Sequence, residues 1–426
     1  MREILRGTWA LFLGIAILML GHGLQGTLLG LRANIERFPD AITGMVMSGY
    51  YVGLLIGSLR VPVLVARVGH VRVFAALLSL GSTAILFQAV FVEPVAWFLM
   101  RLLTGYCFAG AFIVAESWLN GSASNDSRGQ ILSLYMVVQL GGMAAGQFLL
   151  NLADPRGFDL FILVSVLISV AAVPMLLTAV AAPAIGTRGG IGIAALYRLS
   201  PLGVAGIVGV GVGTSGLFSM GPVYASQEGL SVAAISTFMA ALIMGGVVFQ
   251  IPVGRYSDLH DRRRVIAAVA LLTALVLLPP ALLPQLPNYM LYPGFFLVGG
   301  LSLPLYALCV AHTNDFLSSE QMVGASSALV LAFGIGAAAG PTATALSMQA
   351  IGPVGFPIFL ALVHLLLGLF AIWRMTRRAT VPAADRGAYI SLPTPSPVVI
   401  PMAQAKAVAQ SPTPPPSNAP AMADAG

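Results

Sequence analysis

Twelve apolar runs, each long enough to cross a lipid bilayer, constrain this chain more than any other feature. A spanning helix needs roughly 20 apolar residues. The runs lie at about 7–29, 41–66, 71–92, 94–119, 129–152, 158–181, 201–224, 231–253, 264–285, 288–314, 321–346 and 351–374. Only 8% of the 426 residues are charged, against about 25% in soluble domains, so the chain cannot build a wholly water-exposed surface. The sequence therefore predicts an all-α integral membrane protein with twelve transmembrane helices.

Basic residues in the connections between these runs predict the orientation of the chain. If the N-terminus lies in the cytoplasm, seventeen of the 21 Lys and Arg residues fall in cytoplasmic segments. Three fall in outer loops, namely Arg32, Arg37 and Arg156. Cytoplasmic loops carry an excess of Lys and Arg, so we predict a multi-pass protein of the inner (plasma) membrane with both termini in the cytoplasm. The net charge of +6 is then a topology signal, and we expect the lipid bilayer, not nucleic acid, as a partner.

An internal repeat appears when the chain is shifted by 192 residues. The shift pairs Ala33 with Ala225, Glu36 with Glu228, Ala41 with Ala233, Met47 with Met239, Gly53 with Gly245 and Arg72 with Arg264. With six spans on each side, the repeat predicts two pseudo-symmetric six-helix halves, at 1–182 and 201–376, with a cytoplasmic linker at 183–200. Parallel repeats with a binding site between them are a transporter arrangement. The Pro-rich composition of 377–426 predicts a disordered cytoplasmic tail.

Two basic loops fall on each other in this repeat, "RVPVLVARVGH" at 60–70 and "VGRYSDLHDRRR" at 253–264. The second resembles the Gly-x-x-x-Asp-x-x-Asp/Gly-Arg-Arg/Lys loop of the major facilitator superfamily, with Gly254, Asp258, Asp261, Arg262 and Arg263 on the pattern. The first keeps Arg67, Gly69 and Arg72 but has Pro62, Ala66 and His70 where Gly, Asp and Arg are usual. "RLLTG" at 101–105 resembles the Arg-x-x-x-Gly motif of the family's fourth helix. The stretch 101–150, which includes "AESWLNGSASNDSRGQ" with Glu116 and Arg128, resembles the YcaD-like bacterial branch.

The resemblance implies the major facilitator fold and a cytoplasmic gate made by charged helix ends. By analogy with the family, Glu116 and Asp315 form ion pairs with the basic loops that hold the gate closed. Ordinary solvated helix-end charges are the alternative. The expected gate residues are Arg60, Arg67, Gly69, Arg72, Glu116, Arg128, Gly254, Asp258, Asp261, Arg262, Arg263 and Asp315. We expect Arg67 or Arg72 to pair with Glu116 when the cavity faces outward.

Polar residues inside the spans predict where a substrate would bind. Arg101 lies in the fourth span, where a buried Arg is unfavourable by about 2.5–3.5 kcal/mol on insertion scales. We predict that it faces an aqueous cavity and takes part in substrate binding or proton movement. Packing against backbone carbonyls, or a side chain that reaches the outer interface, is the alternative. The expected cavity residues are His22, Gln25, Arg101, Tyr135, Gln139, Gln147, Thr214, Gln250 and Tyr306. For amides such as Gln147, interhelical hydrogen bonds stay open as a second reading.

These patterns favour a secondary active transporter that moves a small molecule by alternating access. Proton coupling would involve His22, Glu116 or groups bound to Arg101. The sequence contains no Walker loop, so ATP is not the expected drive. A membrane-embedded enzyme fits less well, because the five His residues are scattered without metal-ligand spacing, and a channel fits two unlike halves poorly. Gly146-Gln147 stands where drug-proton antiporters usually have Gly-Pro, which argues against that class. We expect a monomer with no cofactor, metal or catalytic residue, and Arg101 favours an anionic or zwitterionic substrate.

Overall fold

The computed structural model describes residues 2–121, 128–177, 191–283, 286–377, 380–382, 386–387 and 389. These residues form helices and connecting segments, with no strand among them. The first half contains α1 (Arg2–Ile35), α2 (Asp40–Val68), α3 (His70–Val90), α4 (Pro94–Gly121), α5 (Arg128–Phe148), the 3₁₀ turn η1 (Leu149–Leu152) and α6 (Asp159–Leu176). The second contains α8 (Pro201–Gln227), α9 (Val232–Leu259), α10 (Arg262–Val276), α11 (Leu278–Leu282), α12 (Asn288–Ser302), α13 (Pro304–Asn314), α14 (Ser319–Ile351) and α15 (Gly355–Met375).

Within the part of the chain that the structure describes, twelve helical segments are long and apolar enough to cross a membrane, which confirms the predicted fold class and span number. Two of them are interrupted where prolines stand. Pro304 begins α13 directly after α12, and Pro279 and Pro280 lie in α11 directly after α10. Proline removes a backbone donor and clashes with the carbonyl four residues earlier, so a helix breaks or kinks there. Each pair still forms one span, Arg262–Leu282 and Tyr289–Asn314.

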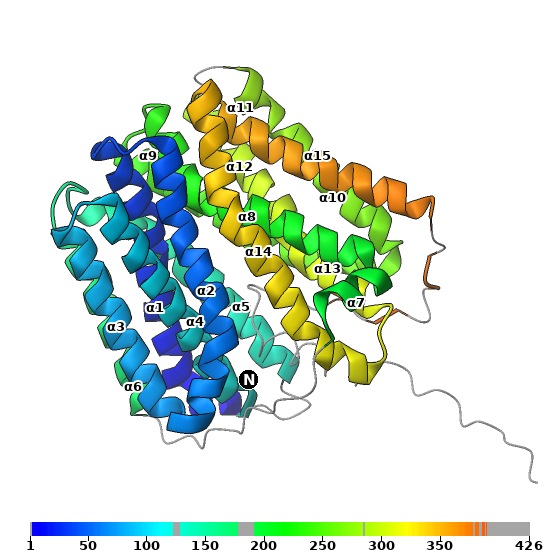
Figure 1. Cartoon of the computed structure of the whole chain (residues 1–426), viewed down its shortest axis with the longest axis horizontal. Helices are drawn as coiled ribbons and strands as arrows, with labels where there is room; N and C mark the ends of the chain where they lie inside the picture. The colour runs from blue at the N-terminus through cyan, green and yellow to red at the C-terminus, as the bar shows by residue number, and fades with distance from the viewer. Residues whose placement is uncertain are drawn as a thin grey trace, which may run out of the picture.

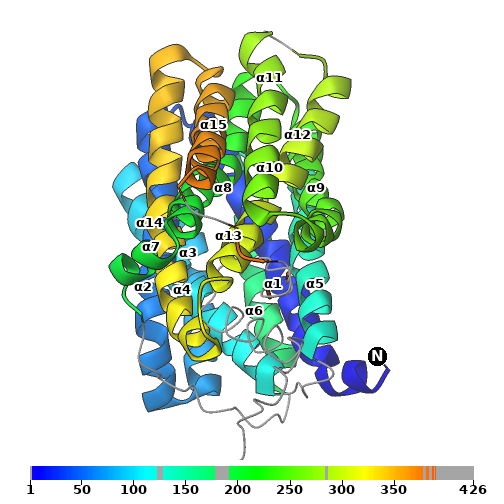
Figure 2. The ribbon, with the colours of Figure 1, turned by 90° about the vertical axis from the view of Figure 1, so that its right-hand side faces the viewer.

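The two halves lie side by side, with α1–α6 on one side of the molecule and α8–α15 on the other (Figure 1). Contacts of α2 with α14, α5 with α9 and α1 with α8 join them. The short helix α7 (Ile193–Leu199) lies within the predicted linker and packs on α8 and α14 (Figure 2). The domain boundaries themselves stay a prediction.

Glycines allow the closest helix contacts, and they do so at matching places in the two halves. A Cβ atom on Gly53 of α2 would lie 1.9 Å from the Leu102 carbonyl oxygen of α4. A Cβ atom on Gly245 of α9 would lie 1.8 Å from the Phe296 carbonyl oxygen of α12. Small residues let backbones approach closely in lipid, where helices associate by van der Waals packing. The 192-residue repeat is therefore visible in the packing as well as in the sequence.

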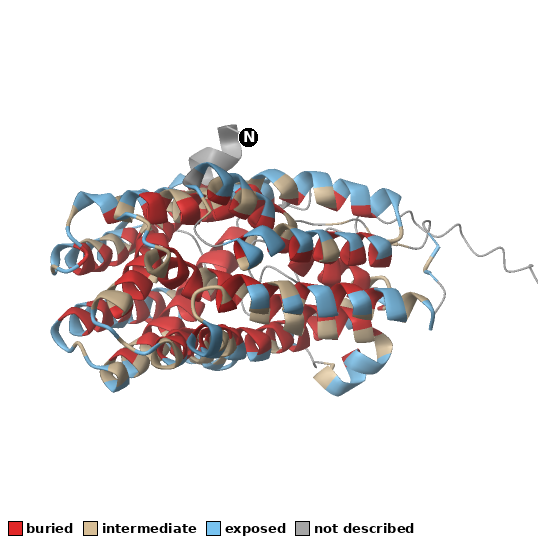
Figure 3. Ribbon diagram, turned by 90° about the horizontal axis from the view of Figure 1, so that it is seen from above, coloured by how far each residue is buried: buried red, intermediate tan, exposed pale blue. Residues whose placement is uncertain are grey.

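Buried residues lie on the helix faces turned toward the interior of the bundle, while exposed residues lie on its outside (Figure 3). The outside carries large apolar side chains, including Leu80, Phe87 and Leu366 at 48%, 46% and 57% exposure. Extensive exposed apolar surface marks an interaction with a membrane or another apolar partner. The surface composition thus agrees with a chain that is surrounded by lipid.

Candidate functional site

A cavity of about 170 Å³ lies between the two halves. On a scale where one water occupies about 10–15 Å³, it holds roughly a dozen water-sized groups. Its walls come from α1, α2, α4 and α5 of the first half and from α8, α9, α13 and α14 of the second. Of the nine cavity residues expected from the sequence, those that line it are His22, Arg101, Gln139, Gln147, Thr214, Gln250 and Tyr306.

Gln25 and Tyr135 lie outside this lining, contrary to expectation. Gln25 follows His22 by three positions, and three steps of an α-helix turn a side chain about 60° away from the starting direction. Its side chain is 1% exposed, and neither amide atom has a hydrogen-bond partner among the described residues. Tyr135 is directed to Glu116, whose carboxylate accepts a hydrogen bond of 2.7 Å from the tyrosine hydroxyl.

Arg101 is held in the cavity wall by α4 and is 4% exposed. Its guanidinium carbon lies 4.5 Å from the centre of the Tyr50 ring, within the range of a cation–π interaction. None of the ion pairs in the described part of the chain includes Arg101, and its Nε has no hydrogen-bond partner there. The nearby His22 ring packs against Phe108 and Tyr50, with centroids 4.9 and 5.6 Å apart. The wall thus presents a cation that no protein carboxylate neutralises in the described structure.

The amide side chains of α5 both line the cavity and form hydrogen bonds within the bundle, the two roles that the sequence left open. Gln147 lines the cavity, yet its Nε2 donates to the Gly23 carbonyl at 3.0 Å and its Oε1 accepts from the Thr27 hydroxyl at 2.5 Å. Gln139 also lines the cavity and donates to the Tyr135 hydroxyl at 3.1 Å. A chain of hydrogen bonds therefore runs from the cavity at Gln139 through Tyr135 to the buried carboxylate of Glu116.

Two cavity residues that the sequence analysis missed are Tyr50 and Tyr51 of α2. Tyr50 supports Arg101, and the Tyr51 hydroxyl hydrogen-bonds Ser219 of α8, across the boundary between the halves. Two adjacent tyrosines in an apolar span are a usable signal, because a buried tyrosine hydroxyl usually needs a partner.

Five hydrogen bonds join the halves near the α1–α2 and α8–α9 turns, and we call them the inter-half seal. They are Asn34–Ser226 at 2.8 Å, Gln227–Asp40 at 2.7 Å, Ala41 N–Gln349 at 3.1 Å, Ser48–Thr342 at 2.8 Å and Asn151–Ser236 at 3.2 Å. All five lie toward one end of the bundle. The cavity therefore has a seal on one side that is made of contacts between the halves.

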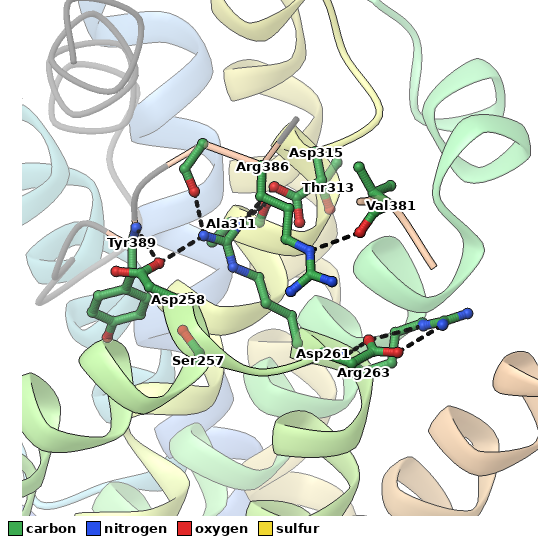
Figure 4. Close-up of polar contacts among 12 residues, drawn as sticks. Ser257, Asp258, Asp261, Arg263, Ala311, Thr313, Asp315, Val381, Arg386 and Tyr389 are labelled. Carbon is green, nitrogen blue, oxygen red and sulfur yellow. Dashed lines mark hydrogen bonds and ion pairs between the residues drawn. The ribbon is translucent and has the colours of Figure 1, made fainter. Parts of the chain in front are cut away.

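At the opposite end, Arg262 at the start of α10 forms what we call the Arg262 cluster, and its partners Asp258, Asp315 and Ala311 are labelled in Figure 4. Its guanidinium is 2% exposed and pairs with Asp258 at 2.9 Å and with Asp315 at 2.5 Å. It also donates to the carbonyls of Ala311, at 3.2 Å, and Gly387. Burial raises the pKa of Asp315 to about 6, although the positive charge of Arg262 acts to lower it. The cluster ties together the α9–α10 turn, the end of α13 and a segment that follows α15.

Asp261 and Arg263 stabilise the start of α10 itself. The Asp261 side chain caps the helix by accepting from the Arg263 backbone N–H at 3.0 Å, and it pairs with the Arg263 guanidinium at 2.7 Å. Burial would raise the pKa of Asp261, but the hydrogen bonds and charge of Arg263 lower it below its usual value. An acidic N-cap is a favourable helix start.

Part of the predicted tail lies on this turn. Arg386 donates to the His260 carbonyl at 2.7 Å, and the Tyr389 backbone N–H donates to Asp258 at 2.8 Å. The Tyr389 ring covers Gly254, where an added Cβ would come within 2.2 Å of the ring. Gly254 of the loop motif thus leaves space for this ring. Residues 390–426 lie outside the described residues.

The first basic loop is arranged differently. Arg60, Arg67 and Arg72 are exposed, and the ion pairs of the described residues include none of them. Gly69 connects α2 to α3 with a φ of 93°, a conformation that glycine adopts readily. The Arg128 side chain lies outside the described residues. The expected pairing of Arg67 or Arg72 with Glu116 stays a prediction.

Comparisons with known proteins agree with this architecture. A family model described as Major Facilitator Superfamily matches residues 228–404. The uncharacterized MFS-type transporter YcaD of Escherichia fergusonii is 27% identical over 381 residues, which cover 89% of this chain and 98% of that protein. The uncharacterized MFS-type transporter YE1530 of Yersinia enterocolitica is 28% identical over 344 residues, covering 80% and 88%.

Solved structures share the fold at low sequence identity. A mutant of the nucleoside transporter NupG superposes with a TM-score of 0.76 at 11% identity, covering 86% of this chain and 99% of that chain. A bacterial homolog of the human lysosomal transporter Spinster, in an inward-facing and unoccupied conformation, gives a TM-score of 0.69 at 13% identity, covering 97% and 99%. Together with the twelve spans, the paired halves and the loop motif, these matches make the chain similar to transporters of the major facilitator superfamily, and in particular to its YcaD-type members.

Proposed function

We propose that the protein is a secondary active transporter that moves a small molecule across the inner membrane by alternating access, coupled to protons. The observation that carries this proposal is the cavity between the halves, with a seal between the halves at one of its ends. A single site between two pseudo-symmetric halves opens to either side when the halves rock against each other.

The basic residues assign the two ends of the cavity to the two sides of the membrane. The inter-half seal lies at the end where the α1–α2 and α8–α9 turns are, and the excess of Lys and Arg at the other end supports an orientation with this seal outside the cell. In this assignment the structure is inward-facing, and the Arg262 cluster lies at the cytoplasmic end.

The net stabilisation that the hydrogen bonds of the seal provide is small enough for the seal to open and close reversibly. A hydrogen bond contributes about 0.5–1.5 kcal/mol net, so five of them contribute roughly 3–7 kcal/mol. Conformers that interconvert in function are separated by a few kcal/mol. The seal is thus strong enough to favour one state, and rearranged contacts at the other end are enough to offset its loss.

Proton coupling is supported by the hydrogen-bond chain from Gln139 through Tyr135 to Glu116. Glu116 is 1% exposed and lies inside the α4 span, where an ionisable side chain marks a functional site by default. In the proposed mechanism, Glu116 takes up and releases a proton. The hydrogen bonds of the Tyr135 hydroxyl to Glu116 and to Gln139 then connect the protonation state of Glu116 to the cavity wall.

A cysteine reporter in the cavity tests alternating access without a known substrate. Cys107 and Cys309 are replaced by alanine, and Gly26→Cys is introduced, because Gly26 lines the cavity and an added Cβ meets nothing within 4 Å. A membrane-impermeant maleimide is then applied from either side of oriented vesicles. We expect labelling from both sides, since the cavity opens to each in turn. Gly192→Cys, in the predicted cytoplasmic linker, is the control that labels from the cytoplasmic side alone.

Locking the seal sharpens the test. Ser48 and Thr342 face each other with their hydroxyl oxygens 2.8 Å apart, so a Ser48→Cys/Thr342→Cys pair is placed to form a disulfide. Oxidation should abolish labelling of Gly26→Cys from outside and preserve it from the cytoplasm, and reduction should restore both. Unchanged outside labelling after oxidation would refute alternating access through this cavity. Proton coupling requires that the two-sided labelling ratio changes with pH and that Glu116→Gln removes the change.

A further inference from the structure

We propose that the substrate is an organic monoanion, a monocarboxylate of about a dozen non-hydrogen atoms in all with an apolar body, and that Arg101 binds its carboxylate. This inference rests on the proposed transport function and specifies the ligand of the same cavity. The first observation is the charge of the cavity lining. The residues that line the cavity, all within the described structure, include one Arg and no Lys, Asp or Glu.

Burial makes this single cation the strongest recognition element of the cavity. Arg101 is 4% exposed, and a guanidinium withdrawn from water needs a compensating partner. The Tyr50 ring at 4.5 Å offers only a cation–π contact. Nε lacks a hydrogen-bond partner among the described residues. A carboxylate would satisfy the guanidinium through two parallel charge-assisted hydrogen bonds, the geometry for which arginine is best suited.

The count of charges favours a monoanion over other ligands. A cationic ligand would be repelled by Arg101, and a neutral ligand would leave the charge of the guanidinium uncompensated. A dianion would bring one charge more than the fixed cation can neutralise. Carboxylate is therefore the simplest group that matches the site.

The other residues that line the cavity indicate what kind of ligand body would fit there. It is mostly apolar and includes Met19, Met143, Phe112 and Phe218. The amide of Gln147 is already bonded to α1, so a polyhydroxylated ligand such as a sugar would find few free partners. An apolar or aromatic body, in contrast, packs against methionine and phenylalanine side chains.

Two hydroxyls add a second point of contact on the opposite half. Thr214 Oγ1 and Tyr306 OH line the cavity and have no hydrogen-bond partner among the described residues. Arg101 belongs to the first half, whereas these hydroxyls belong to the second. A carboxylate that also carries a distal hydroxyl would bridge the halves, so that binding affects their relative position.

Three isosteric probes that differ in charge test the inference on the wild-type protein. They are 4-hydroxybenzoate, 4-hydroxybenzamide and 4-hydroxybenzamidine, which share the ring and the hydroxyl. Their binding to purified full-length protein is measured by thermal shift and by isothermal titration. We expect the acid to bind about 10- to 100-fold more tightly than the amide, because the carboxylate brings a compensating charge and two acceptor oxygens to the guanidinium, whereas the amide brings one neutral acceptor. The amidine should bind most weakly.

Variants assign the effect to Arg101. Arg101→Gln should remove the preference for the acid over the amide, and Arg101→Lys should retain part of it. Arg264→Gln, which removes an exposed Arg from α10, is the matched control and should keep the full preference. If Arg101→Gln does not fold, the comparison of the three probes on the wild type still decides the question.

Each outcome separates this inference from the transport proposal. Failure of the acid to bind more tightly than the amide, including failure of every probe to bind, overturns the monoanion assignment. Alternating access reported by Gly26→Cys can still hold in that case. Acid-selective binding combined with one-sided labelling would instead keep the anion site and refute the transporter.

Discussion

A single added methyl group between α9 and α12 should separate two spans that now touch through their backbones. Gly245→Ala would place a Cβ 1.8 Å from the Phe296 carbonyl oxygen, where ordinary contacts begin at 3.4 Å. The two backbones must therefore move apart by about 1.6 Å, because the obstacle is backbone and not a flexible side chain. Overpacking of this kind typically lowers the free energy of unfolding by about 1–3 kcal/mol.

The assay is thermal unfolding of the purified full-length protein in detergent. A cost of about 1–3 kcal/mol corresponds to a fall in Tm of roughly 2–12 °C, taking 2–4 °C per kcal/mol for a unit of 150–250 residues. Gly294→Ala is the matched control, since it lies on α12 but its added Cβ meets nothing within 4 Å. Alanine is favoured over glycine in helices by up to about 1 kcal/mol, so this control should be neutral or stabilising.

The result that would refute the reasoning is a Tm for Gly245→Ala equal to that of Gly294→Ala. Gly53→Ala gives an independent check in the first half, where the added Cβ would lie 1.9 Å from the Leu102 carbonyl oxygen. Because the two positions are related by the 192-residue shift, their losses should be similar.

Three further predictions concern the charged and hydrogen-bonded groups. Arg262→Ala should lower the free energy of unfolding by about 3–5 kcal/mol, because it removes the ion-pair partner of the buried Asp315 carboxylate. The exposed Arg264→Ala should change this free energy by less than about 0.5 kcal/mol, and equal Tm values for the two variants would contradict the prediction. Burial raises the pKa of Asp315 from 3.8 to about 6, so its contribution to stability is fully present below 3.8 and is lost as the pH rises through about 6. The Tm of the wild type relative to Asp315→Asn should fall over that interval, and a flat difference would exclude Asp315 as the titrating group. Tyr135→Phe should lower the free energy of unfolding by about 1–3 kcal/mol, because it removes the hydrogen bond to the buried Glu116 carboxylate. A variant with the Tm of the wild type would show that this bond contributes nothing to stability.

Much of the architecture could be predicted from the sequence, because lipid imposes a simple rule on it. Every backbone polar group in the hydrocarbon layer must be satisfied internally, so long apolar runs become helices. The breaks inside two spans follow from prolines that the sequence also shows, although the predicted spans at 264–285 and 288–314 were continuous. Helix ends were less predictable. The first helix continues to Ile35 beyond the predicted residue 29, where Arg32 and Glu36 form an ion pair at 2.7 Å.

The cavity was predictable only in part, since hydropathy identifies polar residues in a span but not the direction of each side chain. Arg101 and Gln139 line the cavity, whereas Gln25 does not, although Gln25 is polar like His22 and only three positions away from it. Tyr50 also lines the cavity, and the pair of adjacent tyrosines was the sequence signal that could have indicated it. Such outcomes depend on how the helices pack, which periodicity in a single helix does not specify.

The two basic loops show why a repeat in sequence need not be a repeat in structure. Asp258 stands four residues before Arg262, so the second loop carries its own carboxylate, and the pair is complete within one turn. At the positions 192 residues earlier the first loop has Ala66 and His70, so neither member of that pair is present. We therefore expect Arg67 to take its partner from another helix, one that approaches and withdraws as the halves move in the proposed mechanism. In that mechanism a locally complete pair is kept in every state, whereas Arg67 is paired in one state alone. The missing carboxylate thus supports the prediction that the first loop acts as the gate.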